Sequence, residues 1–152
     1  MDNLFSFYLG TSLFGLPAKR VIEVARNFSL TRVPGAPDFV SGLINLRGEL
    51  VVAVNMRLRM ALAASDDPDL SPMCVYVQTE HTTLGLLVDS VGEMFVLATD
   101  SLKPVPAQLN ASLQKLVIGA YALPSQLLVL IDHEKILTDE QLTFSDIRLK
   151  LA

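Results

Sequence analysis

The 152-residue sequence predicts a mainly β protein built from two related small barrels. Three observations lead to this fold class: four apolar hairpins, an internal repeat, and a composition that is 51% hydrophobic and only 18% charged. This hydrophobic fraction is sufficient for a core without metals or disulfides, which excludes a disordered chain. The mean hydropathy of +0.43 leaves open whether the whole apolar surplus is core or whether part of it forms an interface.

Pairs of short apolar segments separated by turn residues predict the hairpins. The four pairs are 4–9 with 13–16, 41–46 with 50–54, 73–79 with 82–88, and 117–123 with 127–131. In the second pair, Gly48 can adopt the positive φ that a tight hairpin needs.

Helices are expected to be short. Helical spacing of apolar residues predicts one at 18–26, and a strand followed by a capping residue predicts the others at 56–64 and 133–137. Asn55 and Asp132 stand immediately before the last two segments, and both residue types are good N-caps.

The internal repeat lies on either side of a linker at 64–72 that is rich in turn-forming residues. A shift of 77 residues lays 42–60 on 119–137 without a gap and places Gly42 on Gly119. Each copy is predicted to contain a strand, a tight turn, a second strand, an N-cap and a short helix.

A shift of 70 residues extends the repeat upstream and places Glu23 on Glu93. We therefore expect two units, at about 4–60 and 73–137. Small closed barrels are the natural architecture because closure removes exposed sheet edges. Since units of about 60 residues are only marginally stable alone, we expect them to pack face to face with a groove between them.

Composition and charge exclude several classes of protein. The longest apolar stretch, 116–131, is interrupted by glycine, proline and polar residues, whereas a membrane helix needs about 20 mostly apolar residues. The first residues lack the basic start of a secretory signal, and a net charge of −4 gives no surplus for binding nucleic acid. The single Cys74 fits a reducing compartment. We expect a cytoplasmic protein with no nucleic-acid partner and no membrane insertion.

Side chains that could carry chemistry are few and dispersed along the chain. His81 falls in a predicted turn, His133 at a predicted helix start, and Cys74 in an apolar strand, where a structural role is the simpler interpretation. The sequence contains no zinc, P-loop or nucleophile-elbow motif, and the linker aspartates lack the glycine and glutamate of an EF-hand. These features predict a protein that is not an enzyme and has no cofactor or metal.

The hairpin tip at 45–49 is the most distinctive polar feature. Arg47 lies there between two apolar strands, and its guanidinium can donate two parallel hydrogen bonds to the carboxylate of a partner. Glu23 lies among aliphatic residues, at the rim of an apolar patch. Two interpretations stay open: together these residues frame a protein-binding groove, or each is an ordinary surface charge.

The segment 31–60, TRVPGAPDFVSGLINLRGELVVAVNMRLRM, resembles the signature of the CheW-like coupling proteins of bacterial chemosensory systems. In that family a G-x-x-N-L-R-G core follows two prolines. The similarity continues through V-x-E-V at Glu23 and through 85–91 and 127–137. The resemblance implies two SH3-like five-stranded barrels, packed around a hydrophobic groove and accompanied by short helices. It covers a single domain at 1–138, and the tail at 139–152 matches the family poorly.

The resemblance also implies a function. Family members are non-enzymatic scaffolds that connect the cytoplasmic tip of a methyl-accepting chemoreceptor, a helical hairpin, to the regulatory domain of a CheA-type histidine kinase in membrane-associated receptor arrays. The receptor tip is expected to lie in the groove between the barrels. The positions implied to bind it are Val21, Glu23, Gly42, Arg47, Leu87 and Val88. We accordingly expect exposed apolar surface near Val21, Leu87 and Val88.

The sequence departs from the family pattern at two positions. Ala53 replaces a proline and Asn55 replaces an aspartate. These departures and the poorly matched tail motivate an alternative, a divergent adaptor that binds the receptor but not the kinase. A more remote alternative is a small-ligand-binding or enzymatic barrel that uses the cleft between the units, and the scarcity of histidine, cysteine and clustered carboxylates argues against it.

Overall fold

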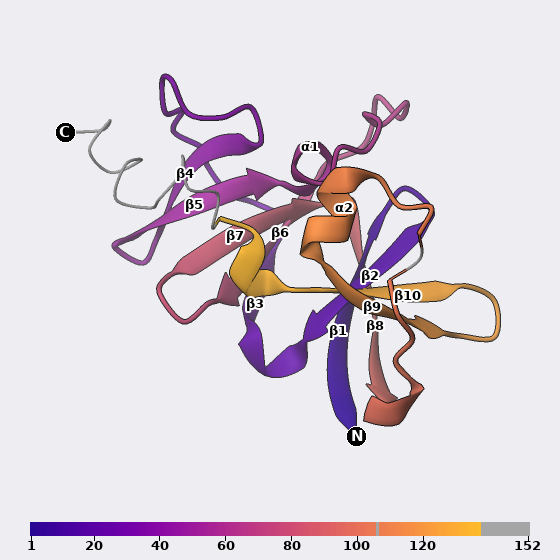
Figure 1. Cartoon of the computed structure of the whole chain (residues 1–152). Coiled ribbons are helices and arrows are strands. Elements are labelled where there is room, and N and C mark those ends of the chain that lie inside the picture. The colour runs from indigo at the N-terminus through magenta and orange to yellow at the C-terminus, as the bar shows by residue number, and fades with distance from the viewer. Residues whose placement is uncertain (106, 138–152) are drawn as a thin grey trace.

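Two five-stranded sheets, each curled into a small barrel, make up the computed structural model, which describes residues 1–105 and 107–137 (Figure 1). Barrel A has the strand order β8-β1-β2-β10-β9. Its strands are Asp2–Leu9 (β1), Ser12–Pro17 (β2), Ser90–Leu97 (β8), Val117–Ala122 (β9) and Leu127–Ile131 (β10). Barrel B has the order β3-β6-β7-β5-β4. Its strands are Val21–Ala25 (β3), Val40–Leu46 (β4), Glu49–Asn55 (β5), Met73–Gln78 (β6) and Thr83–Val88 (β7).

All four predicted hairpins form, as the antiparallel pairs β1–β2, β4–β5, β6–β7 and β9–β10. The helices are short: Met56–Arg59 (α1), Ala111–Leu116 (α2), and the 3-10 turns Ala18–Arg20 (η1), Thr99–Ser101 (η2) and His133–Lys135 (η3). Both predicted caps are confirmed. The Asn55 side chain accepts a hydrogen bond from the Leu58 N–H at 3.1 Å, and Asp132 accepts one from the Glu134 N–H at 3.0 Å.

The helix predicted at 18–26 is wrong beyond its first turn. Only η1 is helical, and the chain then becomes β3, which pairs antiparallel with β6. Hydrogen bonds to a neighbouring strand override the helical spacing of Val21, Ile22 and Ala25, because propensity is a weak signal over so short a segment. The prediction also missed β8 and α2.

The barrels do not coincide with the predicted units 4–60 and 73–137. The hairpin β1–β2 joins β8, β9 and β10, whereas the hairpin β6–β7 joins β3, β4 and β5. Each barrel therefore combines one hairpin from one repeat with three strands from the other. The chain leaves β2 at Pro17 and passes through η1 into the other sheet instead of returning to its own hairpin. Two parallel ladders, β2–β10 and β5–β7, join the exchanged pieces at equivalent places.

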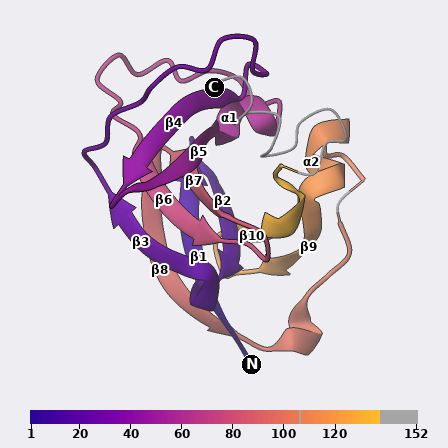
Figure 2. The ribbon, with the colours of Figure 1, turned by 90° about the vertical axis from the view of Figure 1, so that its left-hand side faces the viewer.

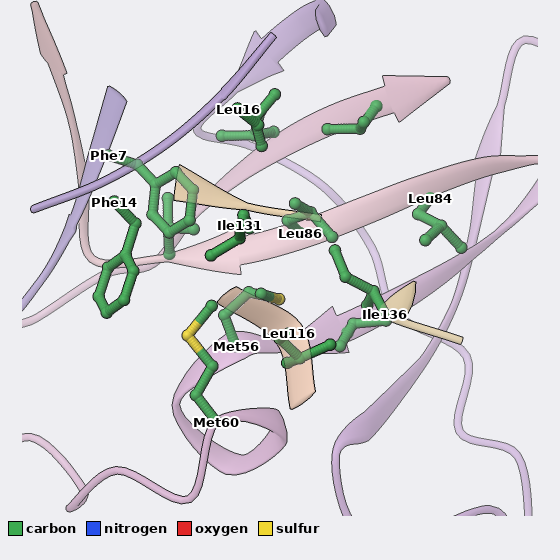
Figure 3. Close-up of a cluster of buried hydrophobic side chains, with 14 of the residues drawn as sticks. Phe7, Phe14, Leu16, Met56, Met60, Leu84, Leu86, Leu116, Ile131 and Ile136 are labelled. Carbon is green, nitrogen blue, oxygen red and sulfur yellow. The ribbon is translucent and has the colours of Figure 1, made fainter. Parts of the chain in front are cut away.

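The largest hydrophobic cluster lies between the two barrels. Figure 3 shows Phe7, Phe14 and Leu16 of barrel A facing Leu84 and Leu86 of barrel B. The rings of Phe7 and Phe14 stack with their centroids 5.7 Å apart. Each buried side chain of this size contributes on the order of 1.5–3 kcal/mol to folding, so this cluster joins the barrels into one unit.

Each barrel also has a small interior of its own. Tyr121 and Leu128 lie inside barrel A, and Val51 and Tyr76 lie inside barrel B. All six residues of β7 are buried, because one face of this central strand points into barrel B and the other into the cluster between the barrels.

Candidate functional site

The hairpin tip between β4 and β5 reaches across to β3. The Arg47 Nη1 atom lies 2.6 Å from the Glu23 Oε1 atom. Since β3 and β4 are the two edge strands of the barrel B sheet, this ion pair crosses the place where the barrel closes, which we call the seam. The Arg47 side chain is 72% exposed and that of Glu23 30% exposed. The structure thus brings together two of the predicted site residues on the surface.

The backbone of the tip holds Arg47 in a conformation that is unusual for a side-chain-bearing residue. Both residues of the two-residue loop have positive φ, 51° at Arg47 and 87° at Gly48. This is the backbone of a type I′ turn, which Asn-Gly sequences favour. The Asn45 Oδ1 atom accepts a hydrogen bond from the Gly48 N–H at 2.8 Å and supports the turn. An arginine in a left-handed conformation costs on the order of 1–2 kcal/mol, and such strain occurs most often at functional positions.

Gly42 is buried on β4 and lets the backbone at Thr31 approach this edge strand closely. It has a φ of 150°, and a Cβ atom at this position would lie 2.5 Å from the Thr31 carbonyl oxygen. Thr31 pairs here with Leu43 through two backbone hydrogen bonds of 2.8 and 2.9 Å. At the equivalent place in barrel A, a Cβ on Gly119 would lie 2.4 Å from a backbone carbonyl oxygen. The repeated glycine is therefore explained by the close approach of the segment that closes each barrel.

Leu87 and Val88 do not themselves contribute to the exposed apolar surface that we expected near Val21, Leu87 and Val88. Leu87 is 8% exposed, inside barrel B, and Val88 is 1% exposed, in the cluster between the barrels. The physical reason is the central position of β7 in its sheet, where both faces are covered. Val21 lies on an edge strand and is half-buried.

Exposed apolar side chains lie on edge strands of the two sheets instead. Ile22 on β3 is well exposed, as are Met94 and Val96 on β8. Figure 2 shows β3 and β8 running along one side of the molecule in that view. Ile22 is the extra residue of a bulge between Val21 and Glu23 in the β3–β6 ladder. Sequence reasoning missed β8 because this strand carries no clear alternation of apolar and polar residues.

A second ion pair connects the barrels. The Arg57 side chain, on α1, donates two hydrogen bonds to the Asp89 carboxylate, one of them from Nε to Oδ1 at 3.0 Å. Asp89 lies where the chain crosses from β7 to β8, and its Oδ2 also accepts a bond from the Gly10 N–H at 2.6 Å. Burial alone would raise the pKa of Asp89, but the hydrogen bonds from Arg57 and Gly10 outweigh it and lower this pKa. Both charged residues belong to segments matched to the family, yet their pairing across the repeats was not predicted.

The other candidate reactive groups are structural or peripheral. Cys74 is buried in barrel B, and burial raises the pKa of its thiol to about 11. Tyr76 is buried beside it, and burial likewise raises the pKa of this phenol. His81 is exposed, while the His133 Nε2 atom lies 3.1 Å from Glu134. Within residues 1–105 and 107–137, no group of three histidine, cysteine or acidic side chains is arranged to hold a metal ion.

Two SH3-like barrels joined by one hydrophobic cluster define a small double-barrel β protein. The chain belongs to the CheW-like family, whose domain matches residues 3–141. It is 27% identical over 140 residues to the chemotaxis protein CheW of Klebsiella aerogenes. The aligned region covers 92% of this chain and 84% of that protein. It is 25% identical to CheW of Rhizobium meliloti, with 91% of this chain and 89% of that protein covered.

A solved structure supports the fold. The scaffolding protein TtCheW from Thermoanaerobacter tengcongensis superimposes on this chain with a TM-score of 0.80 and a sequence identity of 24%. The superposition covers 91% of this chain and 93% of the TtCheW chain. Membership of this family makes the chain a non-enzymatic chemotaxis scaffold. No helix in the described residues is long and apolar enough to cross a membrane. The tail at 139–152 lies outside the described residues.

Proposed function

We propose that this protein couples the cytoplasmic tips of chemoreceptors to a CheA-type histidine kinase in membrane-associated receptor arrays. The observation that carries the receptor contact is the Arg47–Glu23 ion pair on the surface of barrel B. Arg47 is strained in its turn and exposed, so its side chain contributes little to the fold. A guanidinium held in this way is suited to pairing with a partner carboxylate.

The six residues implied by the resemblance divide into two groups on this proposal. Arg47, Glu23 and the half-buried Val21 contact the receptor directly. The other three, Gly42, Leu87 and Val88, shape the barrel beneath that surface. The receptor tip is a helical hairpin, so recognition takes the form of helix-in-groove binding, with apolar contacts for affinity and charges for register.

The departures at Ala53 and Asn55 are compatible with a retained kinase contact. Ala53 is fully buried inside barrel B, so the loss of a proline there does not change the surface directly. Asn55 performs the capping role of the family's aspartate at the start of α1. We therefore propose coupling to both partners in preference to the receptor-only adaptor.

Direct binding to both partners tests the proposal. Isothermal titration calorimetry would use a receptor cytoplasmic fragment and, separately, the kinase regulatory domain. Arg47→Glu places two carboxylates together at the seam and should weaken receptor binding at least tenfold while the protein stays folded. Lys115→Glu, the same charge change at an exposed position on α2, is the matched control and should bind normally. Binding to neither partner would refute the function, and binding to the receptor alone would select the receptor-only adaptor.

A further inference from the structure

The internal repeat divides the chain into two halves, and strands of both halves are present in each barrel. Half 1 spans 1–60 and contains β1 to β5, and half 2 spans 73–137 and contains β6 to β10. In the sheet of barrel A, the hairpin β1–β2 of half 1 lies between β8 and β10 of half 2. In the sheet of barrel B, the hairpin β6–β7 of half 2 lies between β3 and β5 of half 1. Each half thus inserts one hairpin into the other.

Four ladders of backbone hydrogen bonds join the halves. β1 pairs antiparallel with β8 and β3 with β6, while β2 pairs in parallel with β10 and β5 with β7. The cluster between the barrels also draws on both halves, with Phe7 and Phe14 from half 1 and Leu84 and Leu86 from half 2 (Figure 3). Without half 2 the hairpin β1–β2 would stand alone, and an isolated hairpin is at best marginally stable in water. Neither half can therefore complete a barrel by itself.

The halves carry opposite net charges. Half 1 contains seven basic and four acidic side chains, a net charge of +3, whereas half 2 contains three basic and six acidic side chains, a net charge of −3. The ion pair of Arg57 with Asp89 joins the halves, and the Arg59 Nε atom donates a hydrogen bond of 2.8 Å to the carbonyl oxygen of Ile136. Opposite charge favours the pairing of half 1 with half 2 over the pairing of two like halves.

The linker at 64–72 is the covalent connection between the halves and lies outside both sheets. Most of its residues are exposed. Hydrogen bonds to Asp67 hold its turns and come from within the linker, at Asp69 and Leu70. A short flexible connection holds two binding partners at an effective concentration on the order of millimolar. The linker therefore favours a closed monomer in dilute solution, while the ladders and the cluster supply the contacts between the halves.

We propose that a second copy of this chain can complete the interface between the halves, through an exchange of halves between two chains. In the exchanged dimer, half 1 of each copy pairs with half 2 of the other copy and rebuilds the same ladders and the same cluster, as in domain swapping. The dimer then consists of two complete double-barrel units joined by two linkers. Since Arg47 and Glu23 both belong to half 1, each unit keeps its own surface ion pair.

Two full-length chains with lesions in different halves test the proposal. Gly42→Val in half 1 and Gly119→Val in half 2 each place a Cβ atom within 2.5 Å of a backbone carbonyl oxygen, so neither chain should fold alone. Refolded together, they can combine the intact half 1 of one chain with the intact half 2 of the other. Light scattering should find a dimer of twice the 16.6 kDa chain mass. Denaturant unfolding should show the wild-type midpoint, with about half the amplitude of an equal mass of wild-type protein.

A mixture with both lesions in the same half is the matched control. Gly42→Val and Val52→Asp both lie in half 1, and Val52 is fully buried in the cluster between the barrels. No combination of these two chains contains an intact half 1, so the mixture should give no folded dimer. If the first mixture yields no more folded protein than this control, the exchange of halves is refuted.

Cleavage of the linker in the folded protein is a second measurement, which decides the matter if the glycine variants stay folded. A protease site replaces 66–70 in the otherwise wild-type chain and is cut after folding. The two pieces should elute together and unfold in one transition whose midpoint rises with protein concentration, as for any bimolecular complex. Separation of the pieces on the column would refute the interface. The exchange needs neither a receptor nor a kinase, so its failure would leave the proposed function untouched.

Discussion

The substitution Arg47→Asn separates the two roles that Arg47 has at the hairpin tip. It creates an Asn-Gly turn, the sequence most compatible with two successive positive φ angles. It also removes the guanidinium that pairs with Glu23. If the role of Arg47 is receptor binding and not folding, this variant should fold as well as the wild type and bind the receptor poorly.

The expected change in stability is small because two effects oppose each other. Relief of the left-handed conformation at a φ of 51° should return up to about 1 kcal/mol, since asparagine tolerates that region better than arginine. Loss of an ion pair with a 72% exposed arginine should cost about 0–1 kcal/mol. The net effect lies within about 1 kcal/mol of zero. For a chain of this size that corresponds to a change in Tm of about 2–4 °C or less.

Denaturant unfolding and calorimetric titration with a receptor fragment measure the two quantities on the same samples. We expect an unchanged midpoint of unfolding together with at least a tenfold loss of affinity, which is about 1.4 kcal/mol. A loss of stability above about 2 kcal/mol would show that the Arg47–Glu23 pair is structural. Wild-type affinity would show that Arg47 does not contact the receptor.

Two further predictions concern the framework that holds this surface. Asp89→Asn should lower the free energy of unfolding by about 1.5–3 kcal/mol at pH 7, because it weakens the charged hydrogen bonds from Arg57. Because the pKa of Asp89 is lowered in the folded protein, this stabilisation is present above the ordinary aspartate pKa of about 3.9 and is lost as the pH falls through the folded value. Chemical denaturation should therefore show a smaller difference in stability between the variant and the wild type at pH 3 than at pH 7. A difference in stability that is undiminished in acid would contradict the role given to the Arg57–Asp89 ion pair. Gly42→Ala should lower stability by about 2 kcal/mol or more, since its Cβ meets a backbone carbonyl. Gly48→Ala is the control, because its Cβ has open space and only the positive φ opposes it; equal Tm losses in the two variants would refute the close-approach argument.

Local features of the fold could be predicted from the sequence because they depend on neighbouring residues. The four hairpins follow from apolar segments and turn residues, and the cap at Asn55 from its place between a strand and a helix. β8 could not be predicted in the same way. Its residues include the exposed Met94 and Val96, so the pattern of a half-buried strand is absent.

Long-range assembly could not be predicted from the repeat alone. The aligned segments do occupy equivalent places, with Gly42 and Gly119 under the same kind of backbone contact. Sequence similarity, however, says which strands are equivalent and not which strands pair. The exchange of hairpins between the units depends on the path of the chain at Pro17 and Asp89, where a few residues carry it from one sheet to the other.

The candidate site likewise has features that the sequence indicated and features that depend on the long-range assembly of the sheets. The proximity of Arg47 and Glu23 was one of the two interpretations that the sequence left open, because both are charged residues within apolar surroundings. The burial of Leu87 and Val88 was not predicted, because an apolar run in a sequence does not reveal whether one or both of its faces are covered. That information comes only from the position of β7 at the centre of its sheet.

The apolar surplus in the composition now has a structural explanation. Three apolar layers are stacked, with a barrel interior on either side of the cluster that joins the barrels. A strand such as β7 contributes to two of these layers at once and is therefore apolar at nearly every position. The mean hydropathy of +0.43 thus reflects burial on both faces of the central strands. Since those strands are covered, the parts of each sheet left open are its edges, and in barrel B the edges meet at the seam where Arg47 pairs with Glu23.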